Sequence, residues 1–307
     1  MRKRNGRTGT SNLLVVPAAG PAVVEPSEPD AQALAAPLAA ERALRERFAA
    51  MGSVLVAYSG GVDSAYLAWL AHDVLGDRAL AVTALSDSYP AHHYELALGL
   101  ARQVGFAHVT VATHEIDRPE YRANPVNRCY YCKDELYTVL ARLAAERGLA
   151  AIVDGNNADD RGNHRPGRQA AREAGVRSPL DEVGLGKAAI RALAHRAGVP
   201  QWDEPASACL SSRVPYESAV TPEKLKAIDQ AETALRALGF RGCRVRHHDD
   251  VARIELARPD LARAIEPETA AAISAAVKAA GFRFVALDLE GYRTGSLNER
   301  IPLRVVT

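Results

Sequence analysis

A short segment rich in serine and glycine carries the strongest chemical signal in this chain of 307 residues. Ser59–Ser64 reads Ser-Gly-Gly-Val-Asp-Ser and follows an apolar run that is typical of a buried strand. Its glycines allow close approach of a ligand, and its backbone N–H groups and serine hydroxyls favour an anion. Asp63 would repel a bare phosphate, so its place here predicts a bound Mg2+. The lysine of the GxxxxGK[ST] phosphate loop is absent. A plain glycine turn is the alternative interpretation.

Three of the four cysteines stand where sulfur or metal chemistry could occur. Cys129 and Cys132 form a Cys-x-x-Cys within residues 124–133, and Cys209 lies in a polar segment rich in Ser, Arg and Pro. So few cysteines in a chain of this length favour reduced thiols over a disulfide scaffold. A zinc site is the alternative for the pair, although a closed zinc site needs four ligands, and an inert buried thiol is the alternative for Cys209. Cys243 opens a predicted strand and is expected to be a core residue.

Three arginines are the candidate substrate anchors: Arg213, Arg244 and Arg246. A planar guanidinium binds phosphate and carboxylate groups through two parallel hydrogen bonds. Arg244 and Arg246 alternate on a predicted strand and therefore share one face of it. A solvated strand face is the alternative interpretation of the pair.

The predicted elements of the first half of the chain place two of these segments at one edge of a sheet. Buried strands are expected at residues 53–58, 79–85, 108–112 and 150–153, and helices at 65–75, 92–104 and 134–148. This alternation is typical of an α/β domain with a doubly wound parallel sheet. In such sheets ligands bind beyond the carboxyl ends of the strands. Ser59–Ser64 and the polar segment from Asp154 to Asp160 both follow a strand, so chemistry is expected there.

The rest of the chain divides into a leader, a connector and a smaller domain. Residues 1–38 are rich in Ala and Pro and are expected to be a disordered leader. A helix is expected at 39–51 and a Pro- and Ser-rich connector at 202–215. Beyond them, helices at 222–238 and 259–280 and strands at 243–248, 251–256 and 284–287 predict a compact α+β domain. The predicted boundaries are therefore 1–38 for the leader, 39–205 for the α/β domain and 206–307 for the C-terminal α+β domain.

These motifs carry a resemblance to a known family. Ser59–Ser64 resembles the pyrophosphate loop of the ATP pyrophosphatase (PP-loop) superfamily, whose members adenylate a carboxyl or carbonyl oxygen and release pyrophosphate. Four further segments indicate which family within this superfamily the chain resembles. They are residues 124–133, 154–160, 204–216 and 244–255. From about Leu44 to the C-terminus the chain is similar to the LarE family, the ATP-dependent sulfur transferases (sulfur insertases) of nickel-pincer cofactor biosynthesis. One departure is Glu217, which stands where the family is expected to have glycine.

The resemblance implies a reaction and a set of site residues. It implies that ATP and Mg2+ activate a pyridinium carboxylate mononucleotide as its adenylate, which sulfur attacks to give a thiocarboxylate for the nickel-pincer cofactor of lactate racemase. It assigns nucleotide and Mg2+ binding to a set of residues at the sheet edge and in the second strand: Ser59, Gly60, Gly61, Asp63, Ser64, Thr83, Asp154 and Gly155. Asp63 and Cys209 are the predicted catalytic residues.

The cysteines imply two routes for the sulfur. By resemblance, members with only the counterpart of Cys209 give up the sulfur of that residue and leave dehydroalanine. Members that also have counterparts of Cys129 and Cys132 are expected to hold a [4Fe-4S] cluster, because three thiolates leave one iron free to carry sulfide. This chain has all three cysteines, so the cluster-dependent route is the prediction, and the sacrificial route is the alternative.

Composition weighs against other classes of function. The 38 Lys+Arg residues nearly balance the 37 Asp+Glu, and aromatics make up 6%. This speaks against a nucleic-acid partner and hence against a cluster-dependent tRNA thiolase, which needs a basic face and stacking aromatics. No apolar run approaches the ~18–20 residues of a membrane span. A nucleotide sensor would leave the three cysteines unexplained, and an amide-forming synthetase would lack its glutaminase. We therefore expect a cytoplasmic homo-oligomer that acts on a small nucleotide, with a sulfur donor and a downstream nickel-inserting enzyme as partners.

Overall fold

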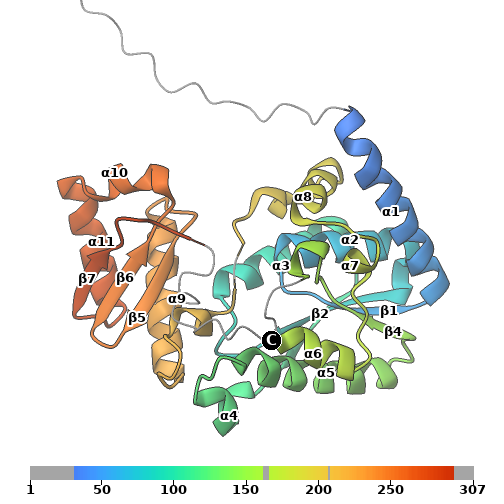
Figure 1. The fold of residues 1–307 in the computed structure, drawn as a ribbon, viewed down its shortest axis with the longest axis horizontal. Helices are drawn as coiled ribbons and strands as arrows, with labels where there is room; N and C mark the ends of the chain where they lie inside the picture. Colours follow the sequence, from blue (N-terminus) through green and yellow to red (C-terminus); the bar gives the residue numbers. More distant parts are fainter. Residues whose placement is uncertain (1–30, 162–165, 207, 294–307) are drawn as a thin grey trace, which may run out of the picture.

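The computed structural model describes residues 31–161, 166–206 and 208–293. An α/β domain and a smaller C-terminal domain lie side by side, with helix α9 (Pro222–Ala237) at the side that faces the larger domain (Figure 1). Most of the predicted leader, residues 1–30, lies outside the described residues.

The larger domain is built on a four-stranded sheet of order β3-β2-β1-β4. Its strands are β1 (Val54–Ala57), β2 (Ala79–Leu85), β3 (His108–Ala112) and β4 (Ala151–Val153). All three pairings are parallel, with Val54 opposite Ala79 on one side of β1 and opposite Ala151 on the other. The predicted α/β fold with a parallel sheet is confirmed.

Helices cover both faces of this sheet, and side chains alternate between them (Figure 1). Val54 and Val56 belong to the apolar cluster on the side of α1 (Ala31–Met51), α2 (Val62–Leu75), α3 (Ala91–Val104), α7 (Pro179–Glu182) and α8 (Lys187–Arg196). Leu55 points the other way, to α5 (Arg128–Glu146) and α6 (Pro166–Glu173). Because β1 is buried on both faces along most of its length, its sequence is a continuous apolar run.

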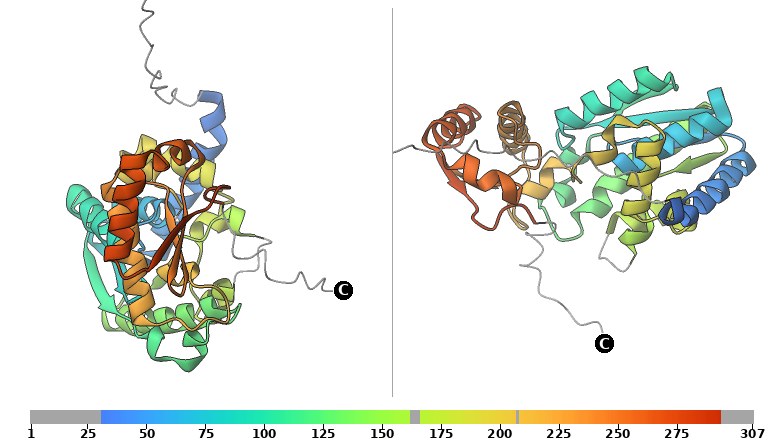
Figure 2. Two further views of the ribbon diagram at one scale, coloured as in Figure 1. Left: turned by 90° about the vertical axis from the view of Figure 1, so that its left-hand side faces the viewer. Right: turned by 90° about the horizontal axis from the view of Figure 1, so that it is seen from above.

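The C-terminal domain packs two helices on a three-stranded sheet. Strand β5 (Arg244–His248) pairs antiparallel with β6 (Val251–Glu255), which pairs parallel with β7 (Phe284–Leu287). Helices α9 and α11 (Pro267–Ala279) contact each other, and their apolar side chains share one cluster with Val245 and Ile254 of the sheet (Figures 1 and 2). Cys243 is fully buried in this cluster, which confirms its predicted core role.

Short helices connect these elements. They are η1 (Gly76–Arg78), η2 (Glu115–Asp117), α4 (Pro119–Arg122), η3 (Ala158–Asp160), η4 (Pro200–Asp203), η5 (Leu210–Arg213), η6 (Arg258–Asp260) and α10 (Leu261–Ala264).

The largest differences from the predicted helix boundaries are found in three places. Helix α1 begins at Ala31 and not at residue 39, because the Ala-rich end of the predicted leader has high helix propensity. Helix α5 begins at Arg128 and not at residue 134, so both cysteines of the pair lie in its first turns. The helix expected at 259–280 is broken before Pro267, whose missing N–H and fixed φ suit the first turn of a new helix.

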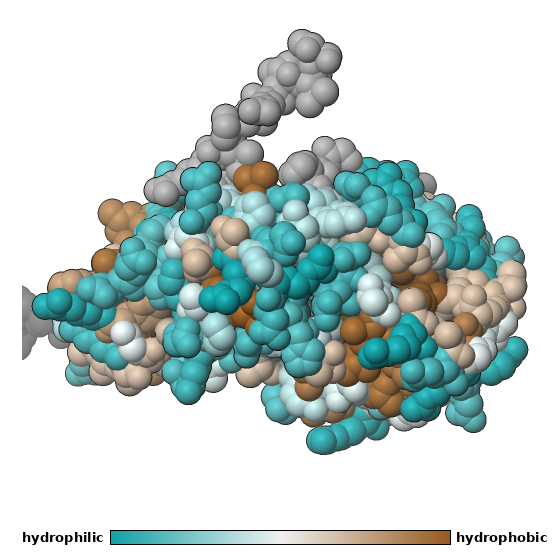
Figure 3. Space-filling view, turned by 90° about the horizontal axis from the view of Figure 1, so that it is seen from below, coloured by the Kyte–Doolittle hydropathy of each residue, from teal (hydrophilic) through white to brown (hydrophobic). Residues whose placement is uncertain are grey.

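Within the described ranges, no helix combines the length and apolar character that crossing a bilayer requires. Seen from below, on the side of α5 and α6, the surface is mostly hydrophilic with a few hydrophobic patches (Figure 3).

Candidate active site

The loop between β1 and α2 has the shape expected of an anion-binding turn. Gly60 has a φ of 72°, and a Cβ there would lie 2.4 Å from the carbonyl oxygen of His93. Only glycine satisfies both conditions. The Ser64 hydroxyl donates to the carbonyl of Gly61 at 3.0 Å and accepts from the backbone N–H of Ser59 at 3.1 Å. The predicted loop residues thus lie together at the start of α2.

Asp63 lies in the first turn of α2 with one carboxylate oxygen engaged and one not. Its Oδ2 accepts from Nδ2 of Asn157 at 2.8 Å, while its Oδ1 is buried without a hydrogen-bond partner among the described residues. Burial raises the pKa of the Asp63 carboxyl, and the Asn157 hydrogen bond and the charge of Lys187 oppose that rise. A buried carboxylate oxygen without a partner fits a divalent cation, which prefers oxygen ligands. The arrangement therefore fits Mg2+ at Asp63.

The segment after β4 packs directly on this loop. Because β1 and β4 are neighbours, their carboxyl ends meet at one sheet edge. A Cβ on Gly155 would lie 3.0 Å from the backbone nitrogen of Ser64, so glycine permits the close approach. Asp154 is buried and accepts from the hydroxyls of Ser178 at 2.7 Å and Tyr137 at 2.8 Å. The structure thus brings Asp154 and Gly155 to the predicted loop.

Thr83 is close to the loop but behind it. Its side chain is fully buried, and its hydroxyl donates to the carbonyl of Tyr58 at 2.8 Å and lies 2.9 Å from Nε2 of His108. With no exposed surface in this conformation, Thr83 supports the end of β1. The structure does not bring it to the open edge where a nucleotide would lie.

A chain of hydrogen bonds links the loop to the connector that carries Cys209. The hydroxyl of Tyr89 donates to the carbonyl of Ser59 at 3.1 Å. One residue earlier, the carbonyl of Ser88 accepts from the backbone N–H of Leu210 at 2.8 Å. The anion-binding loop and Cys209 therefore lie at the same edge of the α/β sheet.

The backbone of Cys209 is held firmly. Its carbonyl accepts from the backbone N–H of Ser212 at 3.0 Å, from the Ser212 hydroxyl at 2.8 Å and from Nη1 of Arg213 at 2.9 Å. Cys209 as a residue is partly exposed. A fixed backbone at a partly exposed cysteine suits a residue whose sulfur must meet a substrate in one orientation.

Arg213 acts inside the chain and does not face a substrate. Its side chain is 0% exposed, and Nε and Nη2 donate to the two carboxylate oxygens of Glu232 at 2.8 and 2.9 Å. Nη1 also donates to the carbonyl of Ala208 at 2.6 Å. In this conformation the guanidinium of Arg213 is not exposed to a substrate, and its donors contact Glu232 and the carbonyls of Ala208 and Cys209.

Helix α5 brings the other two cysteines to the connector. Arg128 is the first residue of α5. Its Nη1 donates to the carbonyl of Ser211 at 3.0 Å and to the side chain of Asn124. The hydroxyls of Ser211 and Tyr121 lie 2.5 Å apart. The Arg128 guanidinium is close enough to the thiols of Cys129 and Cys209 to interact with both electrostatically. The start of α5 and the Cys209 segment thus form one structural unit.

The three thiols influence one another but are not assembled as ligands. Cys129 is an exposed residue, but desolvation of its sulfur raises the pKa of the thiol; the nearby Cys209 adds to this rise, and Arg128 opposes it. Burial also raises the pKa of Cys132 strongly, and the Glu115 carboxylate contributes. Across the described parts of the chain, no three His, Cys, Asp or Glu side chains converge in a way that could hold a metal ion. Thiols are the right kind of ligand for an iron-sulfur cluster, but in this conformation Cys129, Cys132 and Cys209 are not arranged to bind one.

Arg244 and Arg246 share one face of β5, as predicted, and this face meets the connector. Nη1 of Arg246 donates to the carbonyl of Ser212 at 2.9 Å, and its Nη2 to Glu255 at 2.7 Å. Arg244 donates to the carbonyl of Ala206. Both are buried, so they are not a solvated strand face. Their cationic side chains lie beside the segment that carries Cys209.

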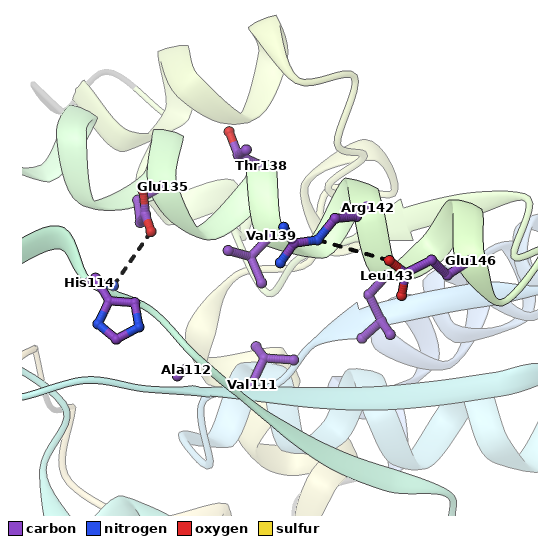
Figure 4. A pocket seen from close by; sticks show the side chains of 9 residues that line it. All are labelled: Val111, Ala112, His114, Glu135, Thr138, Val139, Arg142, Leu143 and Glu146. Carbon is purple, nitrogen blue, oxygen red and sulfur yellow. Dashed lines mark hydrogen bonds and ion pairs between the residues drawn. The ribbon is translucent and has the colours of Figure 1, made fainter.

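A hollow between β3 and α5 is separate from this chemistry (Figure 4). It is lined by Val111, Ala112, His114, Glu135, Thr138, Val139, Arg142, Leu143 and Glu146. None of these is a predicted site residue. The edge of the sheet that carries the loop, and not this hollow, is the candidate site.

Sequence reasoning missed several residues that build the site. Asn157, Tyr89 and Glu115 join its parts, but each has an ordinary residue type at a position that only the fold makes meaningful. The capping motif at Asn157 was the one readable signal, since its side chain accepts from the N–H of Asp159 at the start of η3.

Comparisons with known proteins find a family model and several relatives that are similar to this chain. The model of the NAD synthase family matches residues 40–124, which contain the anion-binding loop. An uncharacterized protein of Synechocystis sp., slr1717, is 44% identical over 255 residues, which cover 83% of this chain and 95% of that protein.

Two further relatives cover nearly the same span. The pyridinium-3,5-bisthiocarboxylic acid mononucleotide synthase of Lactiplantibacillus plantarum is 37% identical over 250 residues, or 81% of this chain and 90% of the relative. The uncharacterized protein MJ0830 of Methanocaldococcus jannaschii is 28% identical over 251 residues, or 82% and 94% of the two chains.

Proposed function

This chain belongs to the LarE family, the family of the Lactiplantibacillus plantarum synthase, within the PP-loop enzymes related to NAD synthase, and from this premise we propose that it is an ATP-dependent sulfur transferase. Its substrate is a pyridinium carboxylate mononucleotide, and its product is the thiocarboxylate. One observation carries the proposal: the anion-binding loop and Cys209 lie at the same sheet edge, joined through Tyr89, Ser88 and Leu210.

The first half-reaction activates the carboxylate. A carboxylate oxygen attacks the α-phosphorus of ATP, the bond to the bridging oxygen of pyrophosphate breaks, and an acyl adenylate forms. Donors at Ser59–Ser64 stabilise the charge that develops on the leaving pyrophosphate. Asp63 would hold Mg2+, which neutralises part of the phosphate charge. The adenylate is a better electrophile than the carboxylate because AMP is a good leaving group.

The second half-reaction replaces AMP by sulfur. A sulfur anion attacks the acyl carbon, and the bond to the AMP oxygen breaks. In the sacrificial route the thiolate of Cys209 forms a thioester. Loss of its Cα proton to a base and cleavage of its Cβ–Sγ bond then release the thiocarboxylate and leave dehydroalanine. The role of Arg213 is to hold the backbone of Cys209 in place for this attack.

A cluster is the second possible source of sulfur. Cys129, Cys132 and Cys209 would hold a [4Fe-4S] cluster, whose open iron supplies exchangeable sulfide when it is bound. The three thiols interact electrostatically, but in this conformation the described residues do not bring them together around one metal position. Arg244 and Arg246, next to this connector, are the proposed anchors for the anionic groups of the substrate.

Nucleotide products test the activation step. We expect the protein with Mg2+ and pyridinium-3,5-biscarboxylic acid mononucleotide to convert ATP to equal amounts of AMP and pyrophosphate. Asp63→Asn should abolish the conversion, while Asp87→Asn, in the adjacent loop, serves as the control. Formation of ADP and phosphate, or no turnover, would contradict the proposal.

The sulfur source needs a separate experiment. After anaerobic purification, iron and sulfide analysis distinguishes a cluster from zinc, and the mass of the protein after turnover reports loss of hydrogen sulfide from Cys209. Stoichiometric zinc without iron would reject the cluster. Conversion of Cys209 to dehydroalanine would identify the sacrificial route even though Cys129 and Cys132 are present.

A further inference from the structure

We propose that His93, in the first turn of α3, is a positioning residue for the anion-binding loop, because it holds the carbonyl of Ser59 so that the N–H of Gly60 faces the pyrophosphate portion of ATP. The inference rests on the proposed function, since it concerns the same nucleotide site. It gives a role to a residue that lies 34 positions after Ser59 and outside the motif at Ser59–Ser64.

The first turn of α3 packs directly on the loop. A Cβ on Gly60 would lie 2.4 Å from the carbonyl oxygen of His93 and 3.3 Å from the Cβ of Ala97. On the next residue, a Cβ on Gly61 would lie 4.0 Å from Cε1 of the His93 ring. His93 is only 4% exposed. Its ring is therefore enclosed where α3 meets the loop.

Two donors hold the carbonyl of Ser59. Nδ1 of His93 lies 3.2 Å from this oxygen, and the hydroxyl of Tyr89 donates to it at 3.1 Å. Because a carbonyl only accepts, Nδ1 of His93 carries the ring proton. Burial lowers the pKa of His93 to about 4, so the ring is neutral at pH 7. Its other nitrogen, Nε2, is buried and has no hydrogen-bond partner among the described residues.

The held carbonyl fixes the direction of the next N–H. The peptide between Ser59 and Gly60 is trans, so its C=O and its N–H point in opposite directions. Since the carbonyl is directed to the start of α3, the N–H of Gly60 is directed away from it. The N–H of Ser59 donates to the Ser64 hydroxyl at 3.1 Å, whereas that of Gly60 donates to no acceptor within the part of the chain that the structure describes. Beside the N-terminus of α2, such an N–H is suited to a phosphate oxygen.

Packing alone does not explain a histidine at this position. A buried ring nitrogen without a partner lowers stability, and the apolar ring of phenylalanine would fill the space without that cost. Phenylalanine could not donate to Ser59, however, and a peptide group that is free to turn would have to be ordered when the ligand binds. Donors that are already oriented avoid this loss of affinity. We therefore assign the His93 ring to the orientation of this one peptide.

Calorimetric titration of the full chain with Mg2+–ATP, inorganic pyrophosphate and AMP tests the assignment. We expect His93→Phe, which keeps a ring but no donor, to weaken binding of ATP and pyrophosphate by roughly 3- to 10-fold, the loss expected for one hydrogen bond. His93→Asn, whose Nδ2 replaces Nδ1, should bind both ligands nearly as well as the unaltered protein. Tyr89→Phe removes the other donor and should cause a loss similar to that of His93→Phe. Binding of AMP should stay unchanged in every variant, because AMP lacks the two phosphates concerned. His195→Phe, at an exposed position near the end of α8, is the matched control.

The outcomes separate this inference from the proposed function. If the unaltered protein binds ATP and His93→Phe binds ATP and pyrophosphate equally well, the assignment of His93 is wrong while the proposed function stands. A loss in His93→Asn as large as that in His93→Phe would also overturn it, because the ring and not its donor would then be what matters. An equal loss of AMP binding would do the same, since it would show a structural role for His93. If the unaltered protein binds no ATP, the proposed function itself fails.

Discussion

Replacing Arg213 by methionine should destabilise the chain and stop sulfur transfer without emptying the nucleotide site. Arg213 is fully buried and holds both carboxylate oxygens of Glu232 at 2.8 and 2.9 Å. Removal of one partner leaves a buried charge, which costs about 3–5 kcal/mol. Domains of ordinary stability have about 5–15 kcal/mol. We therefore expect Arg213→Met to fold with much reduced stability.

A second substitution tests whether the stability lost in Arg213→Met comes from the unpaired Glu232 carboxylate. Glu232→Gln keeps an acceptor for the backbone N–H of Val245, which lies 3.0 Å from Oε1 of Glu232, but removes the charge. The double variant with Arg213→Met and Glu232→Gln should recover about 1–3 kcal/mol relative to Arg213→Met alone, since no unpaired carboxylate stays buried.

The pH dependence supplies an independent check. Burial alone would raise the pKa of Glu232, and Arg213 more than offsets this, so the pKa lies below its ordinary value of 4.5. The pair therefore stabilises the unaltered protein above pH 4.5, and that stability is lost as the pH falls through the lowered pKa. In Arg213→Met the pKa of Glu232 rises instead. The stability difference between the two proteins should shrink as the pH falls from 7 to 4.

The assay is urea unfolding followed by the fluorescence of Trp69 and Trp202, combined with ATP binding and thiocarboxylate formation. Arg213→Met should bind ATP normally but form little thiocarboxylate, because the carbonyl of Cys209 loses a donor. A loss below about 1 kcal/mol, as for an exposed ion pair, would refute the reasoning. So would unchanged sulfur transfer.

Two further substitutions test the backbone. Gly60→Ala should lose ATP binding and about 2 kcal/mol of stability in urea unfolding, because its φ is 72° and its Cβ would meet the carbonyl of His93; normal ATP binding would contradict the loop geometry. Glu217 is exposed with a φ of 69°, at the position where the family is expected to have glycine. Glu217→Gly should raise the free energy of unfolding by about 0.5–1 kcal/mol, the relief of strain less the added entropy of the unfolded chain, and a lower melting temperature would count against this.

The fold was predictable where local signals were strong. The strands at 79–85, 108–112 and 284–287 match the structure to the residue, since a short apolar run between turn residues has few alternative interpretations. The start of α5 at Arg128 was not predicted, because Cys and Tyr have modest helix propensity. It also depends on tertiary contacts such as that between Arg128 and Ser211.

The sequence motifs predicted which segments form the site, but not the direction in which its side chains face. The loop at Ser59–Ser64 and the segment at Asp154 meet because parallel strands end at one edge. Whether an arginine faces a ligand or a carboxylate depends on elements distant in the sequence. The partner of Arg213 lies on α9, so no spacing rule could show that its guanidinium is held in a buried ion pair.

The most direct test of the central claim is a single anaerobic turnover. The protein is mixed with Mg2+–ATP and pyridinium-3,5-biscarboxylic acid mononucleotide, and the masses of the nucleotide product and the protein are measured. Our account predicts AMP and a product in which sulfur replaces a carboxylate oxygen. Cys209→Ala should form no such product, while Cys243→Ala, at the buried core cysteine, should still form it. Equal sulfur incorporation by Cys209→Ala would contradict the account.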